Sequence, residues 1–145
     1  MQNPEELIKL TETENFKIGK RKDGIIHVYF KNNVLIDINK INYLFGLYDE
    51  YTNGVKACFI FEAGHKVGVT REARHYIKKV ENELPVIAGC IIFQNMVYRM
   101  IAVFFLRFNQ PIKPLYIVND FDSGIKWLKL QENEFNDLNN QVLLA

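Results

Sequence analysis

The fold is decided by one apolar run, Val86-Ile87-Ala88-Gly89-Cys90-Ile91-Ile92-Phe93. Two shorter runs share its character: residues 57–61 (Ala-Cys-Phe-Ile-Phe) before it and residues 115–118 (Leu-Tyr-Ile-Val) after it. A strand that is apolar at odd and even positions alike is buried on both faces. Segments of helical period separate the three runs, and this alternation predicts a parallel sheet covered by helices.

The N-terminal half predicts an antiparallel hairpin and one helix. Residues 16–22 and 25–31 flank Asp23-Gly24, a dipeptide typical of a tight turn in which both central residues take positive φ. Residues 34–36 predict a short strand, and Asp37 is the expected cap of a helix that Gly54 ends. The apolar stripe of that helix comprises Ile38, Ile41, Leu44, Phe45, Tyr48 and Tyr51.

Three further helices are predicted between and after the apolar runs. Thr70 stands where an N-cap belongs, ahead of a helix that ends before Pro85. A third helix is expected over residues 94–108, and Asn119 or Asp120 is the expected cap of a fourth. Residues 132–145 form a tail with a weaker pattern, which leaves a short helix open. We therefore expect an α/β fold with a mixed, mostly parallel sheet of about four to six strands and about four covering helices.

Size and charge limit the functional classes. The 145 residues suit a single domain with a core over about residues 16–130, and 48% of them are hydrophobic. Lys and Arg number 18 against 17 Asp and Glu, so the net charge of +1 disfavours a nucleic-acid role. The first residues lack a secretory signal pattern, and Gln94, Asn95 and Arg99 interrupt the longest apolar stretch. We expect a cytoplasmic protein without a membrane span.

The sequence carries no pattern typical of catalysis, a cofactor or a metal, and we expect a protein that is not an enzyme. Ser123 is the only serine and lacks the strand-to-helix turn of a nucleophile. Gly64 and Gly68 are spaced too loosely for a phosphate-binding loop. Cys58 and Cys90 fall inside predicted buried strands. The histidines lie on three different predicted elements without metal-site spacing: His27, His65 and His75.

Four motifs carry a family resemblance. They are residues 34–37 (Val-Leu-Ile-Asp), 70–76 (Thr-Arg-Glu-Ala-Arg-His-Tyr), 99–111 (Arg-Met-Ile-Ala-Val-Phe-Phe-Leu-Arg-Phe-Asn-Gln-Pro) and 125–128 (Ile-Lys-Trp-Leu). With these motifs and this order of elements, the chain resembles the STAS domains, the fold of bacterial anti-sigma-factor antagonists. It is similar in particular to small bacterial proteins described as STAS-like or SEC14-like. The resemblance spans about residues 16–130 and implies a non-catalytic module that regulates or binds other proteins or its own copy.

The resemblance also directs attention to the start of the second predicted helix. In the antagonists, a serine in an Asp-Ser-Ser-Gly-like loop ahead of this helix is phosphorylated by a partner kinase. Residues 62–70 of this chain lack that signature, and Thr70 is the hydroxyl at the comparable place. Thr70 could accept a phosphate beside Arg71 and Arg74, or could simply cap the helix. With Lys78, these residues form either a partner-binding surface or a solvated cationic face.

The third predicted helix has more apolar surface than one covering layer buries. Beyond its core stripe, the apolar surface is extended by Tyr98, Ala102 and Leu106. A second subunit or the C-terminal tail could cover these residues, or they could line a groove for an apolar ligand. The groove agrees with the SEC14-like resemblance, which implies a carrier of lipid or another small apolar ligand. An enzyme is the second alternative, and it would require a pocket that joins His65 and Glu62.

Overall fold

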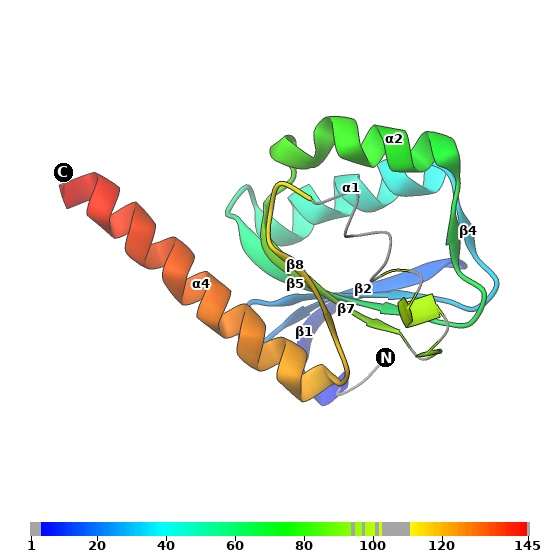
Figure 1. The fold of residues 1–145 in the computed structure, drawn as a ribbon, viewed down its shortest axis with the longest axis horizontal. Helices are drawn as coiled ribbons and strands as arrows, with labels where there is room; N and C mark the ends of the chain where they lie inside the picture. The colour runs from blue at the N-terminus through cyan, green and yellow to red at the C-terminus, as the bar shows by residue number, and fades with distance from the viewer. Residues whose placement is uncertain (1–3, 94, 97, 101, 103–110, 145) are drawn as a thin grey trace.

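The computed structural model describes residues 4–93, 95, 96, 98–100, 102 and 111–144. At its centre lies one six-stranded sheet with the order β1-β2-β3-β5-β7-β8 (Figure 1). The strands are β1 (Leu7–Glu12), β2 (Phe16–Arg21), β3 (Ile26–Phe30), β5 (Ala57–Ala63), β7 (Val86–Phe93) and β8 (Leu115–Val118). The first three pair antiparallel, whereas β3, β5, β7 and β8 pair parallel.

The three apolar runs form adjacent parallel strands, as predicted. Ile60 of β5 pairs with Cys90 of β7, and Ile91 of β7 pairs with Ile117 of β8. Ile60 and Cys90 are fully buried, and Ile117 is 8% exposed. Burial on both faces therefore explains why these strands show no alternation of apolar and polar residues.

The predicted hairpin is present, but its turn differs from the expectation. Arg21 and Ile25 close a three-residue loop, in which the Gly24 N–H also donates to the Arg21 carbonyl at 2.9 Å. Only Gly24 takes a positive φ there, of 86°, and Asp23 does not. The carboxylate of Asp23 instead accepts from the Ile25 N–H and from Arg21. The prediction of two positive-φ residues was wrong because a glycine bulge replaces the two-residue turn.

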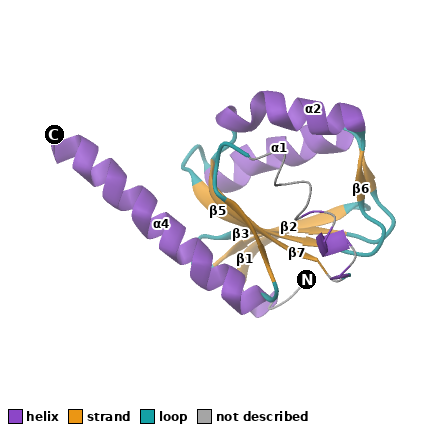
Figure 2. Ribbon diagram, viewed as in Figure 1, coloured by secondary structure: helices purple, strands orange, loops and turns teal. Residues whose placement is uncertain are grey.

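Helices cover both faces of the sheet (Figure 2). On one side, α1 (Ile38–Thr52) packs on the strands, and α2 (Arg71–Val80) lies against α1. On the other side, α4 (Phe121–Leu144) packs on β5, β7 and β8. Short 3-10 turns occur at η1 (Pro4–Glu6) and η2 (Glu81–Glu83).

The first helix differs from its predicted pattern at both ends. Ile38 is 37% exposed rather than part of the core, and Leu47 is buried instead. Asn53, with a left-handed φ of 51°, ends the helix one residue before Gly54. The rest of the stripe is largely confirmed, because Ile41, Leu44, Tyr48 and Tyr51 are buried.

The fourth helix is much longer than predicted. Its cap is Asp120, whose carboxylate accepts from the Ser123 N–H at 2.8 Å. Residues 132–144 continue the helix without a break, so that the last part of α4 extends beyond the sheet (Figure 1). The tail is therefore the end of a 24-residue helix.

Little of the third predicted helix lies within the described residues. Residues 96, 98–100 and 102 are helical, Tyr98 is 39% exposed, and Ala102 is half-buried. Leu106 and Phe104 lie outside the described residues. The expectation of an apolar groove or interface at Tyr98, Ala102 and Leu106 stays a prediction.

Candidate interaction surface

Two loops far apart in the sequence are joined by backbone hydrogen bonds into one strip. The segment after β3 contains β4 (Leu35–Ile36), the segment after β5 contains β6 (Gly68–Val69), and these two strands form a separate parallel sheet. Backbone hydrogen bonds extend the pairing on both sides. Before the strands, the Gly64 N–H donates to the Phe30 carbonyl at 2.8 Å, and after them, the Thr70 N–H donates to the Ile36 carbonyl at 3.0 Å. The starts of α1 and α2, which follow the two strands, are therefore fixed to each other.

Gly64 allows the two loops to approach so closely. A Cβ atom at this position would lie 2.3 Å from the side-chain oxygen of Asn32 and 3.1 Å from the carbonyl oxygen of Phe30. The same Asn32 oxygen accepts a hydrogen bond from the His65 N–H at 2.8 Å. A larger residue at position 64 would thus separate the loops or break this bond.

Both helices that leave the strip have a capped N-terminus. The Asp37 carboxylate accepts from the Lys40 N–H at 2.9 Å, and the Thr70 hydroxyl accepts from the Ala73 N–H at 3.1 Å. The hydrogen bond from the Lys40 backbone lowers the pKa of Asp37, and the Lys40 ammonium adds to the effect. Two helix N-termini, each with a partial positive charge, consequently lie at the same end of the molecule.

The structure gives the four predicted surface residues different local roles. Thr70 is the N-cap, as predicted, and Arg71 is exposed. Arg74 is tied down, because its guanidinium donates to the Val69 carbonyl at 2.7 Å. Lys78 lies about one turn beyond Arg74 in α2 and pairs with Glu81 at 3.1 Å. Thr70, Arg71 and Arg74 thus belong to one end of the strip, whereas Lys78 continues the basic face along the helix.

Two exposed apolar side chains of this surface were missed. Leu35 is 57% exposed and lies beside Gly68, and Ile38 is 37% exposed at the first position of α1. The sequence placed both in apolar patterns, yet their neighbours Val34 and Ile36 are the ones that face the core. All three residues of 34–36 are apolar, so the only available signal was the two-residue period of a strand, which puts Leu35 on the opposite face from Val34 and Ile36. We call the surface of Leu35, Ile38, Thr70, Arg71 and Arg74 the basic end.

A buried polar cluster lies on the opposite side of the sheet, under the start of α4. The Nε2 atom of His27 lies 3.5 Å from Oε1 of Glu62, and both side chains are buried. Phe121 packs over His27 with a centroid distance of 5.1 Å and over the guanidinium of Arg21 at the same distance. Glu62 is therefore directed into the core, away from the exposed His65.

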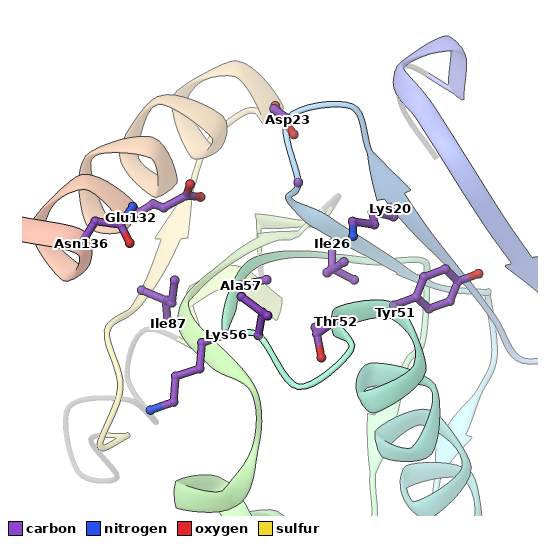
Figure 3. A pocket seen from close by; sticks show the side chains of 12 residues that line it. Lys20, Asp23, Ile26, Tyr51, Thr52, Lys56, Ala57, Ile87, Glu132 and Asn136 are labelled. Carbon is purple, nitrogen blue, oxygen red and sulfur yellow. The ribbon is translucent and has the colours of Figure 1, made fainter. Parts of the chain in front are cut away.

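A hollow of about 260 Å³ lies between the hairpin tip, the end of α1 and the middle of α4 (Figure 3). Its lining includes Lys20, Asp23, Thr52, Lys56, Glu132 and Asn136. Charges of both signs make it unlike the predominantly apolar pockets that hold lipids. It also adjoins the starts of the strands, whereas open α/β sheets bind ligands at the carboxyl ends.

The acidic, histidine and cysteine side chains do not form a metal site in the described part of the chain. Among the described residues, no group of three or more His, Cys, Asp or Glu side chains is placed to hold a metal ion. Burial raises the pKa of both Cys58 and Cys90 to about 12. Within the described part of the chain, each helix is too short or too polar to cross a bilayer.

Comparisons with known proteins support the fold and identify a family. No curated protein matches the chain. A similar solved structure is the crystal structure of an uncharacterized protein from the DUF3478 family, with a SpoIIAA-like fold, from Shewanella loihica PV-4. It matches with a TM-score of 0.58 and 14% identity over 81% of this chain and 97% of that chain. The fold is thus STAS-like, and since the family described as Domain of unknown function (DUF7793) matches residues 20–132, the chain belongs to that family.

Proposed function

We propose that this STAS-like chain is a non-catalytic regulatory module that binds a protein through its basic end. One observation carries the proposal: the β4–β6 pairing brings exposed Leu35 of β4 and exposed Ile38 at the start of α1 to the same end of the molecule as exposed Arg71 and Arg74 in the first turn of α2. Apolar side chains with a polar rim are typical of protein interfaces, and arginine is enriched there. Because the hydrogen-bonded strip is already ordered, binding would cost little loop entropy.

The chemistry of this surface favours an acidic partner segment with apolar side chains. Arg71 offers an exposed guanidinium to a carboxylate, and the N-termini of α1 and α2 add partial positive charge. Leu35 and Ile38 would bury apolar side chains of the partner. A charged pair exposed at the rim would contribute mainly to specificity and association rate, while apolar burial would supply most of the affinity.

Phosphorylation of Thr70 is a proposed means of regulation. A phosphate there would add a charge of about −1.5 to −2 beside Arg71 and would oppose binding of an acidic segment. Intact-mass analysis of protein from its native cell tests this step. A mass that never includes a phosphate under any growth condition would contradict it.

The binding proposal is tested by quantitative co-purification from the native host. The chain is compared with the variant Arg71→Glu/Arg74→Glu and with the control Lys22→Glu/Lys126→Glu, which changes the net charge equally on exposed residues elsewhere. The proposal expects one or more proteins that the control retains and the first variant loses. Equal recovery with both variants would overturn it, provided that circular dichroism shows that both are folded.

A further inference from the structure

The last part of α4 carries an apolar stripe that extends past the sheet. Apolar residues recur every seven positions at Phe121, Leu128, Phe135 and Val142, and Leu138 lies on the same side of the helix. Phe121 and Leu128 are buried against the sheet, whereas Leu138 is 62% and Val142 is 75% exposed. One continuous stripe is therefore buried at its start and bare at its end.

The same part of the helix is acidic. After Lys129 the sequence has no Lys or Arg, but it has Glu132, Glu134 and Asp137. The C-terminal end of a helix also carries a partial negative charge. We call residues 132–142 the acidic tail, an amphipathic helical segment with exposed Leu138 and Val142 and acidic neighbours.

The acidic tail and the basic end are chemically complementary but lie far apart. In Figure 1 the end of α4 and the strand β4 stand at opposite ends of the long axis of the molecule. Each surface has two exposed apolar residues: Leu138 and Val142 on the acidic tail, and Leu35 and Ile38 on the basic end. The tail adds the carboxylates of Glu134 and Asp137 and the C-terminal end of a helix, while the basic end adds Arg71, Arg74 and two helix N-termini. Asp37 and Glu72 are the acidic groups at the basic end, and Lys40 lies 3.6 Å from Asp37. Within one copy the tail cannot reach the surface that matches it.

We infer that the acidic tail of one copy docks on the basic end of a second copy. This inference rests on the proposed function, because it names the partner of the same surface. Leu138 and Val142 would cover Leu35 and Ile38, while the carboxylates of Glu134 and Asp137 would face Arg71 and Arg74. Tail against tail, or basic end against basic end, would place like charges together. The association is therefore head-to-tail, and such contacts continue into open chains unless the rotation closes a ring.

Sedimentation velocity of the purified full-length chain tests the inference. The tail variant is Leu138→Gln/Val142→Gln, and the basic-end variant is Leu35→Thr/Arg71→Glu; each changes exposed side chains only. The wild-type mass is expected to rise with concentration and to fall at high salt, because exposed charges are screened. Each variant alone should remain monomeric. A mixture of the two should form a one-to-one complex, because each retains the half that the other lacks.

Several results would overturn the inference. They are a wild-type chain that remains monomeric at the highest attainable concentration, a single variant that associates like the wild type, and a mixture that stays monomeric. A second tail variant, Glu134→Lys/Asp137→Lys, guards against an unexpected folding defect and should also be monomeric alone. These experiments contain no other protein. A monomeric wild type would therefore refute self-association alone. Binding of another protein through the basic end is tested separately, by the co-purification described above.

Discussion

Replacing Gly64 by alanine should destabilise the protein, because the strip between β4 and β6 leaves no room for a methyl group. The backbone of Gly64 is outside the left-handed region, so alanine would be compatible with its φ angle. The added Cβ would lie 2.3 Å from Oδ1 of Asn32, which must move by about 1.1 Å to reach an ordinary contact of 3.4 Å. It would also lie 3.0 Å from the backbone nitrogen of Asn32, which cannot rotate away.

The expected loss has two parts. Overpacking of one methyl group against fixed backbone costs about 1 to 3 kcal/mol. Displacement of the Asn32 amide would also break its 2.8 Å hydrogen bond with the His65 N–H, which contributes about 1 kcal/mol. We therefore expect Gly64→Ala to lower the free energy of unfolding by about 2 to 4 kcal/mol, a large share of the roughly 5 to 15 kcal/mol typical of domains.

Urea denaturation measures this loss, and Gly46 provides a matched control. Gly46 lies exposed within α1, where an added Cβ would meet nothing within 4 Å. Gly46→Ala should raise stability by up to about 1 kcal/mol, because alanine has the better helix propensity. The double variant Asn32→Ala/Gly64→Ala should lose less than the sum of its single changes, since one clash is removed. A neutral or stabilising Gly64→Ala would refute the close approach of the two loops.

The remaining predictions concern capping, packing and pH. Thr70→Ala should lower stability in urea by about 1 kcal/mol, while Thr70→Ser, which keeps the capping hydroxyl, should change it little. Leu128→Ala removes a fully buried side chain and should lower the free energy of unfolding by about 2 to 5 kcal/mol. Leu130→Ala, at an exposed position two residues away, should change it by no more than about 0.5 kcal/mol. Equal effects of the two changes would show that α4 is rotated about its axis. Capping hydrogen bonds lower the pKa of Asp37 and Asp120 in the folded chain. Both carboxylates therefore stabilise the folded chain fully at a pH above their ordinary pKa. This stabilisation is lost as the pH falls through their lowered pKa in the folded chain. Urea midpoints should therefore decline below about pH 4, and less so in Asp37→Asn/Asp120→Asn, where asparagine still caps; an unchanged decline would contradict these assignments.

The sequence was most informative where burial is complete or where a cap is local. The runs around Ile60, Cys90 and Ile117 predicted adjacent parallel strands because apolar residues on both faces leave few other solutions. Thr70 was identified as a cap because its partner, the Ala73 N–H, is only three residues away. In contrast, β1 was missed because its exposed residues weaken the alternation of apolar and polar positions.

The candidate site was only half predictable, because part of it depends on distant pairing. The basic residues of α2 could be found from helical spacing alone. The exposure of Leu35 is set by its pairing with Gly68, which is distant in the sequence. The length of α4 was hidden for a similar reason, since beyond Leu128 the stripe has no sheet to cover and its neighbours are mostly polar.

The position of β1 has a consequence for how the chain can be shortened. The family match begins at residue 20, so β1 precedes it, yet this strand occupies the outer edge of β2 with antiparallel hydrogen bonds. Phe16 and Ile18 of β2 are buried. Trimming the chain to start at Phe16 would expose the edge of β2 that β1 covers, with the backbone N–H and C=O groups that now pair with β1. Such a fragment would pair through this exposed edge with other extended peptides, including further copies of itself. The strand β1 therefore protects the chain against aggregation through β2.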